Sequence, residues 1–261
     1  MKTCKAGVWL ASAFLSIVLA APLAAGEVEL KFVVHPDDFE AAVGVASQKR
    51  GDIETRNIYF VETAKRELGG VQLILRLREK PGKKDDATVK LRGPTAASVD
   101  LQKFAAAGAG EESKLEIDRV VGGRDALSFS ITAKQKEGDV AKLRVGERKL
   151  AELFSTTQKS FLAHYAGGVA WQSALLLGPV KTEKWEFEIR DFPGKLTAEI
   201  WHLPGEKSEP MIEFSIKADS GHADALAESL KSSLTALKLR QPEKPESKTQ
   251  AVLDRLLGQP K

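Results

Sequence analysis

The stretch Glu27-Val-Glu-Leu-Lys-Phe-Val-Val34 decides the fold, because charged and apolar residues alternate along it. Side chains on a β-strand point to opposite faces in turn, so one face carries Glu27, Glu29 and Lys31 while the other can be buried. Similar alternation predicts further strands at 57–61, 71–79, 87–92, 115–121, 127–133, 184–191, 195–203 and 211–217. The pattern therefore predicts a curved antiparallel sheet with one charged face.

Helical patterns lie between these strands and after them. Apolar residues recur at helical spacing in 36–46, 147–164 and 222–239, and a short helix is predicted near 253–257. These segments place the chain in the α+β class, with helices flanking the sheet. The segment 93–110, rich in alanine and glycine, is expected to be a mobile loop that borders the charged face.

The amino-terminal segment has the order of a secretory signal peptide. Lys2 and Lys5 precede an apolar run over 6–21, and Pro22 and small residues follow it. An uncleaved membrane anchor is the alternative, but the small residues before Glu27 favour cleavage after residue 26. We therefore expect an exported protein, periplasmic or secreted, without a stable membrane anchor.

Cysteine content and net charge exclude some kinds of site and ligand. The single cysteine, Cys4, lies in the predicted signal peptide, so the mature chain has no disulfide, thiolate metal site or cysteine nucleophile. Loss of Lys2 and Lys5 lowers the formal net charge from +3 to +1. A general nucleic-acid binder normally carries a clear basic excess, so no such binding is expected.

The predicted charged face mixes acids with bases, and this mixture has a possible use. Carboxylates can hold a hard divalent cation while lysines and arginines hold phosphate oxygens. Besides the first strand, the face includes Arg76, Arg78, Lys90, Arg92, Glu116, Asp118, Glu186, Glu188, Arg190, Glu199 and Glu213. The alternative is an ordinary solvated face, and periodicity alone favours it.

Several motifs favour a binding site over an ordinary solvated face. Glu27-Val-Glu-Leu-Lys31 matches an ExExK signature, and the stretches 59–63, 75–78, 88–90 and 212–216 follow it in a fixed order: Tyr-Phe-Val-Glu-Thr, Leu-Arg-Leu-Arg, Thr-Val-Lys and Ile-Glu-Phe-Ser-Ile. Together they resemble the CYTH-like or triphosphate tunnel superfamily, which includes class IV adenylyl cyclases, thiamine triphosphatases and inorganic triphosphatases. The chain is thus identified as a divergent, exported relative of that superfamily.

The resemblance implies an eight-stranded antiparallel β-tunnel or cupped barrel over 27–240, followed by a polar linker and a short helix in 241–261. It also implies Mg²⁺ or Mn²⁺, and it assigns roles by position. The metal ligands would be Glu27, Glu29 and Glu213, and the phosphate-binding residues would be Lys31, Arg76, Arg78, Lys90 and Arg190.

One departure from the family pattern limits the expected activity. Ser215 stands where the closing strand would carry a second acid beside Glu213, and a hydroxyl is a weaker ligand for a hard cation than a carboxylate. The predicted function is binding of a phosphorylated small molecule or polyphosphate with a divalent metal, and weak triphosphatase activity is left open. The alternative is a non-enzymatic barrel for another anionic ligand or a protein partner, and a cyclase is a third, less favoured reading.

Overall fold

The computed structural model describes residues 27–258 except 106–107, 109, 206–207 and 246. The predicted signal peptide, 1–26, lies outside the described residues, so its cleavage stays a prediction. Among the helices that are described, none is long and apolar enough to cross a membrane.

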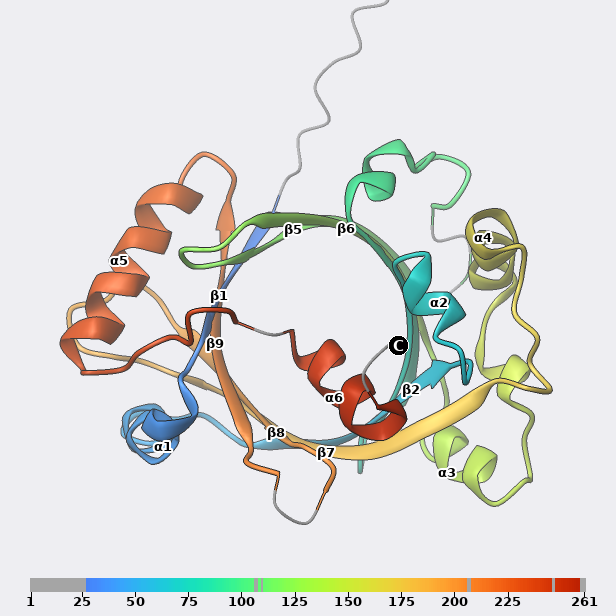
Figure 1. The fold of residues 1–261 in the computed structure, drawn as a ribbon, viewed down its shortest axis with the longest axis horizontal. Helices are drawn as coiled ribbons and strands as arrows, with labels where there is room; N and C mark the ends of the chain where they lie inside the picture. The colour runs from blue at the N-terminus through green and yellow to red at the C-terminus, as the bar shows by residue number, and fades with distance from the viewer. Residues whose placement is uncertain (1–26, 106–107, 109, 206–207, 246, 259–261) are drawn as a thin grey trace, which may run out of the picture.

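Within the described residues, nine strands close into a barrel, which appears as a ring in Figure 1. Around the ring they follow the order β1-β5-β6-β4-β3-β2-β7-β8-β9. Their bounds are β1 Glu27–Val33, β2 Glu54–Glu62, β3 Leu73–Glu79, β4 Asp86–Arg92, β5 Glu111–Val120, β6 Asp125–Lys134, β7 Leu175–Phe187, β8 Leu196–His202 and β9 Met211–Asp219. The predicted tunnel with flanking helices is confirmed.

Two details of the predicted barrel need correction. The part of the chain that the structure describes has nine strands rather than eight: eight was the number implied by the resemblance, whereas the alternating stretches themselves mark nine. One pair of strands is also parallel, because Val28 of β1 lies opposite Ile117 of β5 with both strands running the same way. Strands β2, β3 and β4 lie between them in the chain and supply the long connection that a parallel pair requires.

The barrel carries its charged side chains inside and its apolar side chains outside. On β1, Val28, Leu30 and Phe32 are almost fully buried and belong to a hydrophobic cluster with the outer helices. Glu29 and Lys31, on the other face of the same strand, line the interior. The alternation read from the sequence therefore separates the tunnel lining from the hydrophobic core.

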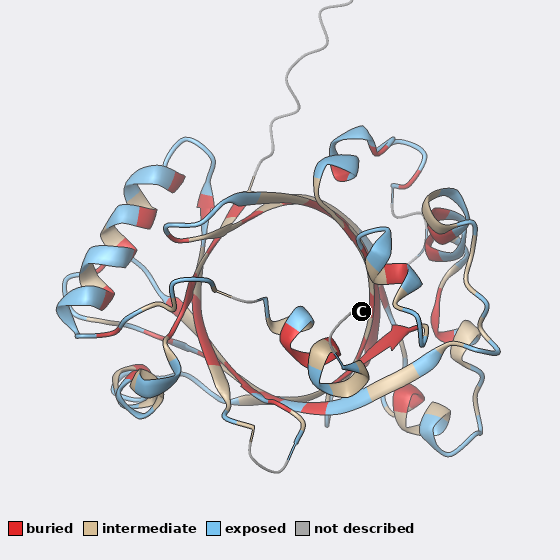
Figure 2. Cartoon of the chain, viewed as in Figure 1, coloured by how far each residue is buried: buried red, intermediate tan, exposed pale blue. Residues whose placement is uncertain are grey.

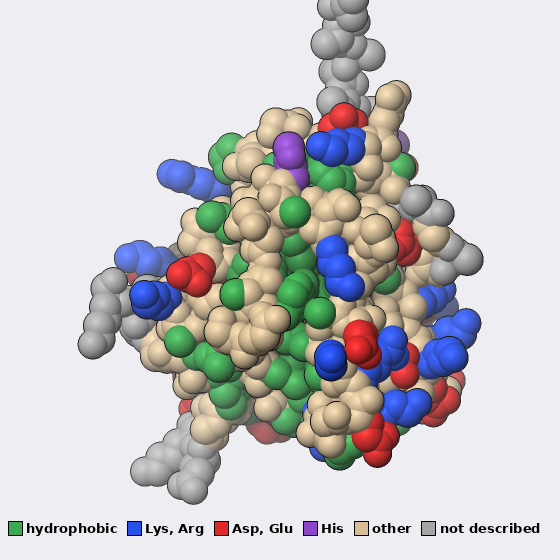
Figure 3. Space-filling view, turned by 90° about the vertical axis from the view of Figure 1, so that its right-hand side faces the viewer, with side chains coloured by type: hydrophobic (Ala, Val, Ile, Leu, Met, Phe, Trp, Pro, Cys, Tyr) green, Lys and Arg blue, Asp and Glu red, His purple; other side chains and the backbone are tan. Residues whose placement is uncertain are grey.

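Helices cover the outer surface of the barrel on two sides. Helices α1 (Phe39–Ala46) and α5 (Ala223–Ala236) cover the side of β1 and β9, and α2 (Glu67–Gly70), α3 (Asp139–Arg144) and α4 (Thr156–Ala166) lie on the other side. Their buried residues face the barrel (Figure 2). Gln158 of α4 donates hydrogen bonds to the carbonyls of Ala87 and Ile131, both 2.9 Å, and so fixes α4 on β4 and β6. Figure 3 looks onto the α4 side, where apolar side chains gather in the middle of the face.

The segment predicted as a mobile loop, 93–110, has structure in its described part and does not line the tunnel. A 3₁₀ turn spans Pro94–Ser98, and Phe104 is only 1% exposed. The Phe104 ring packs edge-on against Phe161 of α4, with 5.0 Å between ring centroids. A buried aromatic anchor therefore holds this segment on the outer surface.

The carboxy-terminal helix α6 (Lys248–Leu257) takes the place that was expected of that loop. It lies inside the ring of strands in Figures 1 and 2. Ala251, Val252 and Leu253 are buried in a cluster with barrel residues that include Phe60 and Trp201. The segment after the predicted barrel domain thus packs within the barrel.

Candidate functional site

The barrel encloses a cavity of about 510 Å³ whose lining is dominated by charge. Lysine and arginine outnumber acids by eleven to six in this lining. The acids are Glu29, Glu112, Glu116, Asp118, Glu199 and Glu213, and the bases are Lys31, Arg56, Arg76, Arg78, Lys90, Arg92, Lys114, Arg124, Lys184, Lys217 and Lys248. An enclosed space with excess positive charge favours an anionic ligand.

Three of the acids come together on one wall. Glu29 and Asp118 lie opposite each other in the parallel pair of β1 and β5, and Glu116 precedes Asp118 by two residues on the same face. Glu29, Glu116 and Asp118 each offer one carboxylate oxygen within 4.8 Å of the others. We call these three residues the acid triad. Three hard oxygen donors at this separation fit a divalent cation of the Mg²⁺ or Mn²⁺ type.

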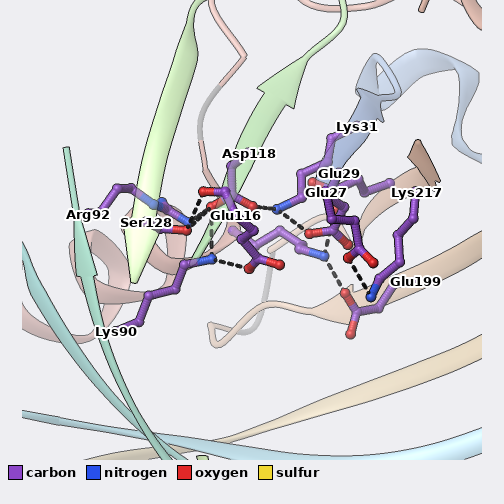
Figure 4. Close-up of polar contacts among 12 residues, drawn as sticks. Glu27, Glu29, Lys31, Lys90, Arg92, Glu116, Asp118, Ser128, Glu199 and Lys217 are labelled. Atoms are coloured by element: carbon purple, nitrogen blue, oxygen red, sulfur yellow. Dashed lines mark hydrogen bonds and ion pairs between the residues drawn. The ribbon is translucent and has the colours of Figure 1, made fainter. Parts of the chain in front are cut away.

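Basic side chains already neutralise the acid triad, with Asp118 at the centre of the network (Figure 4). Lys31 donates to Asp118 at 2.5 Å and lies 2.9 Å from Glu29. Lys90 donates to Glu116 at 3.0 Å and to Asp118 at 2.8 Å. Further donors are Arg92 and Ser128, each 3.3 Å from Asp118, and Lys114, which lies 2.7 Å from Glu116.

The contacts between Asp118 and Lys31 shift the pKa values of both groups towards their charged forms. Burial alone would raise the pKa of Asp118, but the charges of Lys31, Lys90 and Arg92 hold it well below its usual range. Burial likewise opposes the charge on Lys31, and the neighbouring acids, Glu29 first, raise its pKa above the ordinary value. The central carboxylate of the acid triad, Asp118, is therefore held in its ionised form by the ammonium groups that it contacts.

A second wall of the tunnel is basic. Arg56, Arg76, Arg78 and Lys184 extend from the neighbouring strands β2, β3 and β7, and we call them the basic wall. Arg78 pairs with Asp86 at 2.6 Å, and Arg56 pairs with Glu54 at 2.5 Å. Burial and the nearby charge of Arg56 lower the pKa of Lys184.

Arg76 differs from its neighbours on the basic wall. Among the described residues no carboxylate lies within 4.0 Å of its guanidinium, and its buried Nε has no acceptor. Burial and the charge of Arg78 lower the pKa of Arg76 to about 10, so it stays charged at neutral pH. A partly buried cation that no carboxylate contacts is costly unless a ligand supplies the negative charge.

A third group of charges lies where α6 meets the barrel. Glu199 of β8 and Glu213 of β9 lie opposite each other on neighbouring strands. The Lys248 ammonium donates to both carboxylates, at 2.9 Å to Glu213, and lies 5.2 Å from the centroid of the Trp201 ring. Burial alone would raise the pKa of Glu199, but the charge of Lys248 holds it well below its usual range.

The structure brings most of the predicted phosphate-binding residues to one cavity. Lys31, Arg76, Arg78 and Lys90 all contribute to its lining. Arg190 does not: it is exposed in the turn after β7 and is not part of the candidate site. The strand predicted over 184–191 ends earlier than expected, because β7 stops at Phe187, before the Phe192-Pro-Gly194 turn.

The three predicted metal ligands do not share one site. Glu29 belongs to the acid triad, whereas Glu213 pairs with Lys248. Glu27 is not in the cavity lining and pairs with Lys114 and, at 2.8 Å, with Lys217. Glu29 lies instead with Glu116 and Asp118, which the alternation placed on the charged face but which were not predicted as metal ligands.

Lys248 was missed by the sequence reading, because it lies beyond the predicted barrel. The short helix was predicted near 253–257, whereas α6 begins five residues earlier, with Lys248 as its first residue. A cation is disfavoured there by the helix dipole and so needs an acidic partner.

Comparison with known proteins places the fold. No family model and no curated protein matches the sequence. Among solved structures, HpAC1 from Hippeastrum, a candidate adenylyl cyclase described with a dominant triphosphatase activity, superposes with a TM-score of 0.59 at 13% identity over 88% of this chain and 95% of that one. A candidate adenylate cyclase from Bacillus halodurans gives 0.54 at 14% identity over 86% and 97%. At such identities the likeness establishes the fold, and it spans nearly the whole length of both proteins.

Proposed function

Because the chain has the CYTH-like triphosphate tunnel fold, we propose that its tunnel binds a linear triphosphate or polyphosphate together with a divalent cation. Binding is the main activity in this proposal, and hydrolysis is slow. Export belongs to the same proposal and is supported by the order of residues 1–26.

The unpaired Arg76 carries the proposal. Its guanidinium lies in the lining beside Arg78, where like charges repel and burial removes water. An anion with several oxygens relieves both costs, because a guanidinium can donate two directed hydrogen bonds to one phosphate group. Lys184 lies nearby on the basic wall, so a chain of phosphates can meet more than one cation.

The acid triad is the proposed place of the divalent cation. When bound, such an ion would neutralise phosphate oxygens and orient them. Lys31 and Lys90 line the same cavity and contact the acid triad, so an ion that takes their place on the carboxylates would free both ammonium groups to donate to the phosphate. The ligand would thus lie between the acid triad and the basic wall.

Slow hydrolysis is expected because two acids of the acid triad are weak bases. A general base must accept a proton from water near neutral pH. Asp118 is a poor base because its pKa is held far below its usual range, and Glu116, whose pKa is also lowered against the effect of burial by Lys90, is little better. Ser215 on β9 adds no carboxylate to the closing strand.

The test compares Arg76→Met with Lys83→Met by titration calorimetry against tripolyphosphate, with and without Mn²⁺. Lys83 is a matched control, because its side chain is 63% exposed and lies 3.6 Å from Glu54 outside the cavity lining. We expect Arg76→Met to weaken binding at least about tenfold, equivalent to about 1.4 kcal/mol, and Lys83→Met to leave it unchanged.

The melting temperature of the free protein gives an independent measurement. Because no carboxylate contacts Arg76, the melting temperature of Arg76→Met should be equal to or above that of the wild type. Absence of tripolyphosphate binding by the folded wild type in both conditions would reject the proposed function. An equal loss of affinity in both variants would reject the role of Arg76.

A further inference from the structure

The pair Glu199 and Glu213 is unfavourable without a cation. The two residues lie directly opposite each other on β8 and β9, and their side chains are only 18% and 9% exposed. Like charges in directly opposed cross-strand positions repel, and burial strengthens that repulsion. A positive charge between them therefore stabilises this part of the barrel.

Lys248 supplies that charge from a separate element. Its ammonium contacts both carboxylates, its side chain is 15% exposed, and it lies over the ring of Trp201. Lys248 is the first residue of α6, where the helix dipole disfavours a cation. The two acids therefore explain its position better than helix stability does.

The rest of α6 has its own attachment to the barrel. Ala251 and Val252 are fully buried in the cluster that includes Phe60 and Trp201. At the other end of the helix, Arg66 forms an ion pair with Asp254 and donates to the carbonyl of Leu253 at 2.6 Å. The helix thus has contacts that remain when Lys248 is changed, so the effect of the ammonium can be tested separately.

We propose that α6 is an autoinhibitory plug, whose Lys248 ammonium occupies the Glu199–Glu213 pair in place of an external divalent cation. The proposal rests on the proposed function, since it concerns regulation of the same tunnel. An ammonium that contacts both carboxylates fills the space between them, so Lys248 and a divalent ion exclude each other there. Withdrawal of Lys248 would leave the Glu199 and Glu213 carboxylates facing the cavity and would reopen the tunnel end closed by α6.

The first test is calorimetric titration with Mn²⁺ alone, without any phosphate compound. We expect Lys248→Met to bind Mn²⁺ at least about tenfold more tightly than the wild type, or to gain a second site. The gain should vanish in Lys248→Met combined with Glu213→Gln. Lys244→Met is the matched control, because Lys244 is exposed in the same linker and does not line the tunnel, and it should behave as the wild type.

A second measurement uses the wild-type protein and applies even if Lys248→Met fails to fold. Hydrogen exchange of the α6 amides, 249–257, should become faster when Mn²⁺ is added at saturating concentration, because the ion competes with Lys248. Unchanged exchange in α6 under these conditions would overturn the proposal. Unchanged Mn²⁺ affinity in folded Lys248→Met would overturn it as well.

Binding of tripolyphosphate separates this inference from the proposed function. If Lys248→Met weakens tripolyphosphate binding and leaves Mn²⁺ affinity unchanged, Lys248 is an ordinary anion ligand and the plug proposal is wrong. If Lys248→Met tightens Mn²⁺ binding while no variant binds tripolyphosphate, the competition of Lys248 with metal stands and the proposed function falls.

Discussion

Replacing Asp118 with asparagine should destabilise the tunnel more than any comparable change on the surface. Asp118 is buried and contacts three cations, of which Lys31 and Lys90 keep a second acid while Arg92 has no other ion pair among those the structure describes. Breaking a buried ion pair from one side costs about 3–5 kcal/mol. Because two of the three cations keep a partner, we expect a loss near the lower end, about 3 kcal/mol.

Urea unfolding followed by circular dichroism measures this loss, with Asp125→Asn as the control. Asp125 also pairs with an arginine, Arg119 at 2.6 Å, but its side chain is 43% exposed. An exposed pair contributes up to about 1 kcal/mol, so the control should lose no more than that. Similar losses in the two variants would refute the view of Asp118 as the centre of a buried network.

The pH dependence gives a second check on Asp118. Its pKa is lower in the folded state than in the unfolded chain, so its stabilisation is complete above the unfolded value, about 4. Stabilisation is lost as pH falls from there towards the folded pKa. The difference in unfolding free energy between wild type and Asp118→Asn should therefore be constant from pH 8 to about 5 and shrink below about 4. A difference that grows on acidification would contradict the assigned shift.

Two further predictions concern catalysis and export. Ser215→Glu should tighten Mn²⁺ binding, because it places a second carboxylate on β9 beside Lys31 and Glu213, and phosphate release from tripolyphosphate shows whether turnover rises with it; unchanged Mn²⁺ affinity in a folded variant would contradict the weak-ligand argument. Intact-mass analysis of protein recovered from the exporting organism should give a chain that begins near Glu27, and a main species that retains Met1 would contradict cleavage.

Much of the barrel could be predicted from sequence because alternation depends only on neighbouring residues. That rule put Glu29 and Lys31 on one charged face with Arg76, Arg78 and Lys90, and the family resemblance placed these residues in a tunnel, whose cavity all five line. The rule specifies the face of each residue but leaves the order of strands open.

The features that alternation does not predict depend on contacts between distant segments of the chain. The acid triad exists because β1 and β5 pair in parallel, and no local pattern marks that pairing. Lys248 reaches the tunnel only because apolar residues of α6 pack into the end of the barrel. The polar linker before α6 gives no sign in the sequence that the helix packs there. Arg190 was predicted on the charged face because the alternation continues past Phe187, but the strand itself ends at Phe187.

The position of β1 also sets the order in which the chain can fold. β1 pairs on one side with β5 and on the other with β9, the last strand of the barrel. Until Met211–Asp219 is available, one edge of β1 has no partner, so the ring stays open however well the middle strands have formed. Such a contact between distant parts of the chain slows folding. We therefore expect closure of the ring to be a late event in folding, and, if the proposed export occurs, this step would follow the passage of the chain across the membrane.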